Sequence, residues 1–157
     1  MKLEKELKLN NRSMDANHEA LLSVVLTAAQ LHKLAERFFV KYNVTDTQFN
    51  ILMTLNDSGP DGLTQQELSE KLVVHKSNVT GLVDRLEKLG YVKRQVDAED
   101  RRCNYIVLTP KGDKLIGKAE APYFSEVDRI MNSLSEGEKR ALISSTGKIR
   151  QAIHQKA

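Results

Sequence analysis

The stretch 64–109 constrains the fold of this chain most, because three local patterns follow one another there without a linker. A capping-box pattern at its start predicts a short helix. Apolar residues at helical spacing predict a second helix over about 76–89, ended by Gly90. β-prone residues on both sides of the turn-like 97–100 then predict a hairpin over about 91–109. Short helix, turn, short helix and hairpin is the order of a winged helix-turn-helix.

Two helices are predicted before this stretch. Apolar residues recur every three or four positions over 16–41, which predicts a long amphipathic helix that needs a partner surface. Thr45 and Gln48 form another capping-box pattern, and the turn-forming 57–60 ends the helix that it starts.

Two more helices are predicted after the hairpin. Thr109 before a proline starts one that runs to about residue 132, with Pro122 as a candidate bend. Ser135 and Glu138 form the capping-box pattern of the last helix.

The expected fold class is therefore mostly α with a small β-hairpin wing. At 157 residues the chain is long enough for one sizeable core, so we expect a single domain over 1–157. Within it, 45–112 is the predicted winged helix-turn-helix part. The segments 13–41 and 113–155 are the predicted helical dimerisation part, because their apolar stripes are longer than one small core can cover.

Composition excludes several other classes of protein. Apolar residues make up 40% of the chain and charged residues 29%, as in a soluble helical protein, and no apolar run is long enough for a membrane span. One cysteine, Cys103, allows neither an internal disulfide nor a cysteine-based zinc site. The polar first residues lack the apolar core of a signal peptide, so the expected location is cytoplasmic.

The second short helix carries the candidate binding surface. Its apolar residues from Val79 to Leu89 share one side, which leaves small polar and basic residues on the other. Such side chains can bond base edges or neutralise phosphates, and Gly81 would let backbone approach DNA closely. Taken alone, the same pattern also fits an ordinary solvated helix face.

Charge supports the binding interpretation locally, although the whole chain has a net charge of only +3. Between Lys71 and Arg94 there are six basic and two acidic residues, and 6 − 2 gives a local excess of +4. The hairpin tip adds Asp100, Arg101 and Arg102, whose guanidinium groups suit the negative potential of a narrow minor groove. The alternative at the tip is a solvated ion pair that contributes under about 1 kcal/mol.

Several motifs together resemble the MarR family of bacterial regulators over about 45–118. They are Thr45-Asp46-Thr47-Gln48-Phe49-Asn50-Ile51-Leu52, Leu68-Ser69-Glu70-Lys71-Leu72, the run from Val79 to Val92, Asp100-Arg101-Arg102, and Leu108-Thr109-Pro110-Lys111-Gly112. The resemblance implies a homodimeric repressor or activator that places a recognition helix in the major groove and a wing in the minor groove. It also implies that Arg102 enters the minor groove, that Asp100 orients it, and that Arg101 contacts phosphate.

The resulting prediction is a ligand-responsive, sequence-specific regulator, more specifically a repressor, that binds double-stranded DNA as a homodimer. Its operator would be pseudo-palindromic with half-sites about 10 bp apart, and the small-molecule effector is implied by the resemblance alone. The candidate DNA-binding residues are Thr64, Gln65, Lys76, Ser77, Asn78, Thr80, Gly81, Arg85, Asp100, Arg101 and Arg102.

Two other functions stay open at this point: a winged-helix module that binds another protein, and a redox-sensing regulator that uses Cys103 next to two arginines. No nucleophile or phosphate-loop motif predicts an enzyme. The four histidines are scattered, so neither a metal nor another cofactor is predicted.

Overall fold

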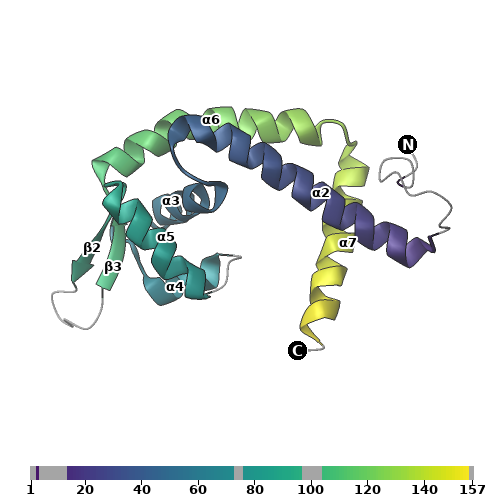
Figure 1. Cartoon of the computed structure of the whole chain (residues 1–157), viewed down its shortest axis with the longest axis horizontal. Helices are drawn as coiled ribbons and strands as arrows, with labels where there is room; N and C mark the ends of the chain where they lie inside the picture. The colour runs from purple at the N-terminus through teal and green to yellow at the C-terminus, as the bar shows by residue number, and fades with distance from the viewer. Residues whose placement is uncertain (1–2, 4–13, 73–75, 97–103, 156–157) are drawn as a thin grey trace. The chain divides into compact units, whose positions relative to one another are not determined.

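The computed structural model of the chain describes residues 3, 14–72, 76–96 and 104–155. The chain divides into two compact units, Met1–Ile116 and Gly117–Ala157. The first unit contains the helices and strands up to the start of α6 (Pro110–Met131), and the second contains the rest of α6 and α7 (Glu136–His154). Figure 1 shows the order of the elements along the chain.

The first helix of the described part, α2, covers Ala16–Phe39 and confirms the long helix that the apolar spacing predicts. Asp15 caps its start, where its carboxylate accepts from the backbone N–H of His18 at 2.9 Å. A short 3₁₀ helix, η1 (Val40–Tyr42), follows α2, and Asn43 ends it with a left-handed φ of 57°.

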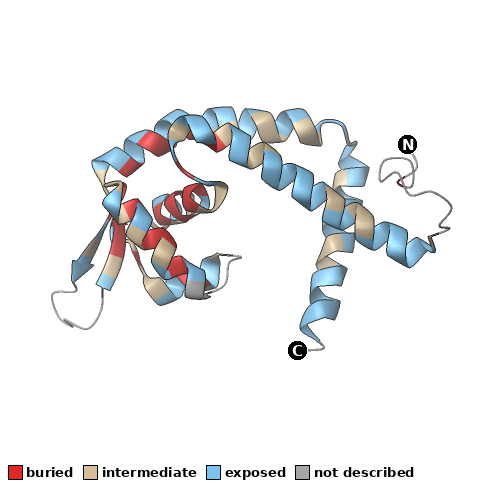
Figure 2. Cartoon of the chain, viewed as in Figure 1, coloured by how far each residue is buried: buried red, intermediate tan, exposed pale blue. Residues whose placement is uncertain are grey.

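Helix α3 (Asp46–Ser58) forms the centre of the core in the first unit. Both bonds of the predicted capping box are present: Gln48 N–H donates to Thr45 Oγ1 at 3.2 Å, and Thr45 N–H donates to Gln48 Oε1 at 2.9 Å. Four apolar residues of α3 are almost fully buried: Phe49, Ile51, Leu52 and Leu55. Figure 2 shows this buried group together with the buried faces of α5 and the strands.

The helix-turn-helix consists of α4 (Gln65–Lys71) and α5 (Lys76–Lys88), and the turn 73–75 lies outside the described residues. One side of α5 packs into the core, as predicted, through Val79, Leu82, Val83 and Leu86. The opposite side is therefore the surface that α5 presents to solvent.

The hairpin is present as β2 (Val92–Val96) and β3 (Asn104–Leu108), which pair in antiparallel register. A third strand, β1 (Leu63–Thr64), pairs with β3 and gives the sheet order β1-β3-β2. Two residues carry no strand periodicity, so the sequence pattern did not predict β1. Gly62 precedes it at a φ of +75°, and an added Cβ would lie 2.3 Å from the Ile106 carbonyl oxygen, so this approach requires glycine.

Thr109 and Ser135 start α6 and α7 as predicted. Gly112 N–H donates to Thr109 Oγ1 at 3.2 Å, and Ser135 forms a complete capping box with Glu138. Helix α6 continues through Pro122, and no residue of α7 is buried. Among the residues described, no helix is long and apolar enough to cross a membrane.

Candidate nucleic-acid interface

The outer side of α5 exposes three of the residues predicted to contact DNA. Asn78, Thr80 and Arg85 are exposed, and Gly81 between them is half-buried. A Cβ added to Gly81 would meet nothing within 4 Å, so the surface there is open. Lys76 and Ser77 belong to the first turn of α5, and their side chains lie outside the description.

Gln65 brings the start of α4 into contact with this surface. Its amide Nε2 donates a hydrogen bond of 2.5 Å to Thr80 Oγ1, although the two residues are 15 positions apart in the chain. The structure thus joins two predicted site residues from different helices into one polar group.

Thr64 forms the capping box of α4, so its backbone N–H and its hydroxyl are both bonded to Glu67. Its hydroxyl accepts from Glu67 N–H at 3.2 Å and donates to Glu67 Oε2 at 2.8 Å, and its own N–H donates to the same oxygen at 2.8 Å. These bonds lower the pKa of Glu67; the backbone N–H of Thr64 has the larger effect and its hydroxyl the smaller one. The visible role of Thr64 is therefore to fix the first turn of α4, which carries Gln65.

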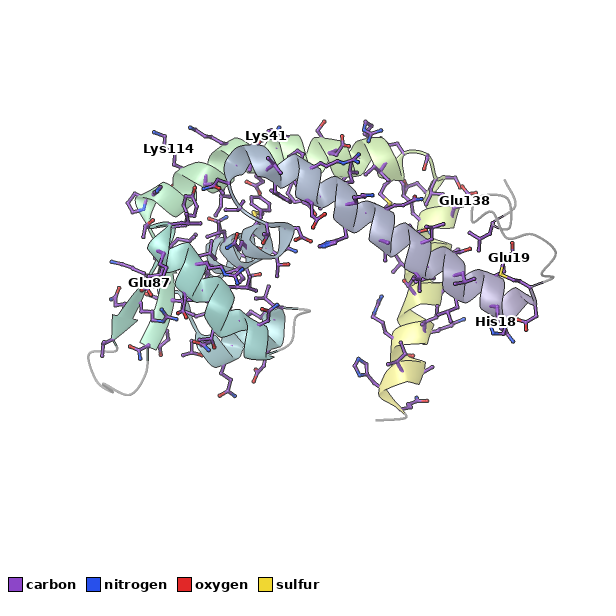
Figure 3. All side chains as sticks on the ribbon, viewed as in Figure 1. His18, Glu19, Lys41, Glu87, Lys114 and Glu138 are labelled. Carbon is purple, nitrogen blue, oxygen red and sulfur yellow. The ribbon has the colours of Figure 1, made fainter. Side chains whose placement is uncertain are left out.

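Arg94 joins the wing to helix α5. It lies on β2, and its Nη2 donates to Asp84 Oδ1 at 2.5 Å, while Nη1 pairs with Glu87 Oε2. The backbone N–H of Arg94 also donates to Glu87 Oε1 at 3.0 Å. Figure 3 labels Glu87 on α5, near the strands. The hydrogen bond to Asp84 is the main cause that raises the pKa of Arg94.

This triad changes how the local charge excess is distributed. Arg94 with Asp84 and Glu87 has a net charge of −1, and the five other basic residues between Lys71 and Lys93 supply +5, so that 5 − 1 gives the local excess of +4. Arg94 is therefore engaged by carboxylates of its own chain. Counting charges along the sequence missed this pairing, and the only signal for it was two carboxylates on one side of a helix, at i and i+3.

The carboxyl end of α5 is tied to the first turn of α6. Lys111 Nζ donates to the Leu89 carbonyl at 2.7 Å, and Thr109 Oγ1 donates to the Gly90 carbonyl at 2.6 Å. Cations and hydroxyl donors at this position satisfy carbonyls that have no partner within the helix. Gly112 allows the close approach, because an added Cβ would lie 2.2 Å from the Tyr91 carbonyl oxygen.

The predicted wing tip lies outside the described residues. Asp100, Arg101 and Arg102 fall there together with Cys103, between the described strands β2 and β3. No group of three or more metal-binding side chains occurs among the residues that the structure covers. One of the four scattered histidines, His32, faces two carboxylates: its Nδ1 lies 3.1 Å from Asp46 Oδ2, and its Nε2 lies 3.6 Å from Glu36 Oε1.

Comparison with known proteins agrees with this geometry. The sequence pattern described as the MarR family matches residues 42–102. The chain is 30% identical over 148 residues to the HTH-type transcriptional regulator PecS of Dickeya dadantii, covering 91% of this chain and 89% of that protein. It is 28% identical over 157 residues to the transcriptional repressor MprA of Escherichia coli, covering 98% and 89%.

Among solved structures, a complex of Staphylococcus aureus MepR with DNA superposes with a TM-score of 0.74 at 24% identity, covering 83% of this chain and 93% of MepR. At this level of identity the likeness shows the fold: mostly helical, with a small antiparallel sheet as the wing.

Proposed function

The chain belongs to the MarR family, and from this premise we propose that it is a transcriptional regulator that binds double-stranded DNA in a sequence-specific manner. The observation that carries the proposal is the two-sided character of α5. Its apolar side is almost fully buried, and its opposite side exposes Asn78, Thr80 and Arg85. A short helix of this kind fits the major groove and presents donors and acceptors to base edges.

The residues divide by the kind of contact that their chemistry allows. Asn78 and Thr80 can bond base edges, whereas Arg85 and Lys76 can neutralise phosphates. Gly81 leaves room for a close approach of the α5 backbone, and Ser77 at the start of the helix adds a small polar group. Thr64 and Gln65 support this surface from α4.

The wing completes the proposal with residues that the structure does not describe. Arg102 enters the minor groove, Asp100 orients its guanidinium, and Arg101 contacts phosphate. The antiparallel pair β2 and β3, which leads to this tip, supports that arrangement.

A homodimer is the proposed assembly, because both units expose large apolar residues. On α2 these are Leu21, Val24, Val25 and Leu31, and on α7 they are Leu142, Ile143, Ile149 and Ile153. A two-fold pair would read a pseudo-palindrome with half-sites about 10 bp apart. Repression, as in the name of the relative MprA, and release from DNA by a small-molecule effector belong to the same proposal. So do a cytoplasmic location and the lack of an enzymatic activity.

Selection of bound fragments from random double-stranded DNA tests this function. We expect enrichment of a two-fold symmetric sequence, and an affinity that falls steeply as salt rises because phosphate contacts release counterions. Arg102→Ala should weaken binding to the selected sequence and leave the oligomeric state unchanged, as measured by mobility shift and sedimentation.

The controls separate this function from the two alternatives. Asn78→Ala should reduce binding to the selected sequence more than to random DNA, since it removes a base contact. If no sequence is enriched and binding is insensitive to salt, the protein-interaction module is favoured instead. If Cys103→Ser abolishes a response of DNA binding to peroxide, the redox-sensing alternative is favoured.

A further inference from the structure

Thr80 differs in its hydrogen bonding from Thr54 and Thr146, two half-buried threonines inside helices. Thr54 and Thr146 each donate their hydroxyl to the carbonyl four residues earlier, at 2.8 Å. This is the ordinary bond of a threonine inside a helix. Thr80 instead accepts a bond from Gln65 Nε2. Its hydroxyl hydrogen has no acceptor among the described residues.

The inventory of donors and acceptors shows what Thr80 can still do. A hydroxyl has one hydrogen to donate and two lone pairs that accept. Because Gln65 donates to the oxygen, the hydroxyl hydrogen is directed away from the amide and toward another acceptor. Thr80 is exposed, so that direction is open to a ligand on the outer side of α5.

We propose that Gln65 holds Thr80 as a hydrogen-bond donor to DNA, so that the pair selects an acceptor atom on a base edge. This inference rests on the DNA-binding function proposed above and adds the chemistry of one contact. The acceptors in the major groove are purine N7, guanine O6 and thymine O4, whereas the amino groups of adenine and cytosine are donors. A phosphate oxygen is also an acceptor, and the experiment distinguishes it from a base.

Gln65 is the positioning residue of the pair. It is the first residue of α4, directly after Thr64, whose bonds to Glu67 fix that turn. The half-buried Gln65 side chain crosses from α4 to α5 to reach Thr80. Without its amide, the Thr80 hydroxyl could turn back to the carbonyl four residues earlier, as Thr54 and Thr146 do.

A double-mutant cycle on the full-length protein tests the coupling. The variants are Thr80→Val, Gln65→Leu and the double variant, with Thr80→Ser as the control that keeps the hydroxyl. Each is titrated against the DNA sequence selected by the wild-type protein and against a random duplex. We expect each single variant to bind the selected sequence about tenfold more weakly, the double variant to bind it no more weakly than Thr80→Val, and Thr80→Ser to bind it as the wild type does.

In Thr80→Val, Gln65→Leu and the double variant, binding to random DNA should fall by a smaller factor than binding to the selected sequence. If the acceptor is a purine N7, replacing each purine of the selected sequence in turn by its 7-deaza analogue should weaken wild-type binding at one position and leave the binding of Thr80→Val unchanged there. If the acceptor is guanine O6 or thymine O4, a base analogue lacking that oxygen should weaken wild-type binding and leave the binding of Thr80→Val unchanged in the same way.

Three results would overturn the inference. The losses of the single variants could multiply in the double variant, which would show that the two residues act independently. The selected and random duplexes could lose affinity equally, which would assign the contact to phosphate. Finally, every base analogue could change the binding of Thr80→Val and of the wild type by the same factor, which would show that Thr80 contacts no base acceptor. If the wild-type protein selects no sequence at all, the proposed function fails instead, so the two failures are distinguishable.

Discussion

Arg94 shows how a single side chain can join two parts of the proposed DNA-binding surface. It lies at the base of the wing and pairs with Asp84 and Glu87 on α5, and its side chain is 29% exposed. Charge-assisted bonds to two carboxylates restrict how β2 can move relative to α5. The base of the wing and helix α5 therefore form one block at this point.

Replacing this arginine should loosen the block. We expect Arg94→Met to lower the free energy of unfolding by about 1 kcal/mol, because two carboxylates lose their partner while the aliphatic part of the side chain is kept. Urea unfolding followed by circular dichroism measures the change. The neighbouring Lys93→Met is the matched control and should change stability by less than about 0.5 kcal/mol. Equal stabilities of the two variants would contradict the role assigned to Arg94.

Side-chain partners were predictable where they were close in sequence. The capping boxes of Thr45, Thr64 and Ser135 are all present, because a bond from i to i+3 depends only on the local helix start. The pairs Arg94–Asp84 and Gln65–Thr80 were missed, because they depend on how the strands and helices pack. Residue identity alone does not determine that packing.

At the scale of elements, Glu67 links the stability of α4 to pH. Its folded pKa lies below the ordinary value of 4.5, so its contribution is present above that value and is lost as the pH falls through the folded pKa. Glu67→Gln keeps a neutral acceptor for the capping box but cannot titrate.

We therefore expect the melting temperature of Glu67→Gln to lie below that of the wild type at pH 7, and the difference to shrink as the pH falls below 4.5. Thermal melts between neutral and acid pH measure it. Glu70→Gln on the same helix controls for the loss of one negative charge. A difference that stays constant over this range would contradict the linkage.

Helix α6 contains two glycines whose replacement by alanine should change the stability of the chain in opposite directions. An added Cβ at Gly112 would lie 2.2 Å from the Tyr91 carbonyl oxygen, whereas one at Gly117 meets nothing within 4 Å. Gly112→Ala should therefore destabilise the chain by about 1–3 kcal/mol through backbone displacement. Gly117→Ala should stabilise it by up to about 1 kcal/mol through helix propensity. Urea unfolding of both variants tests the pair, and a tolerated Gly112→Ala would show that Gly112 does not approach the Tyr91 carbonyl as closely as described.

The elements themselves were largely predictable from the sequence. Caps, turns and apolar spacing located the α-helices from α2 to α7, and β-prone residues located β2 and β3, whereas the 3₁₀ helix η1 was not predicted. The strand β1 was not predicted, because a two-residue strand is determined by its partner β3 and not by its own pattern. Whether the wing tip has the predicted form is still a prediction, since 97–103 lie outside the described residues.

At the scale of the whole molecule, the apolar residues of α7 need a covering surface. No residue of this helix is buried, and Ile143 and Ile153 are 67% and 63% exposed. Leu142, Ile149 and Ile153 recur at seven and four residues, which places them on one side of the helix. Apolar spacing predicted this side from sequence, but a pattern within one chain cannot identify what covers it.

If a second copy of the chain covers the apolar side of α7, charges placed on that side should prevent dimerisation. Ile149→Glu combined with Ile153→Glu should convert the homodimer to a monomer, because two carboxylates would have to be desolvated without partners. Sedimentation measures the change in mass. Ser144→Glu, an exposed position on the opposite side of α7, is the control that adds charge without touching the apolar side, and it should remain dimeric.

The same variant separates assembly from DNA reading. Two linked recognition helices bind a two-half-site operator more tightly than either alone, because the second contact forms at high effective concentration. The double glutamate variant should therefore lose affinity for the full operator by about 10²-fold or more and bind an isolated half-site as the wild type does. If it sediments as a dimer, α7 does not form the interface. If it is monomeric but binds the full operator as tightly as the wild type, the operator is not read by a two-fold pair.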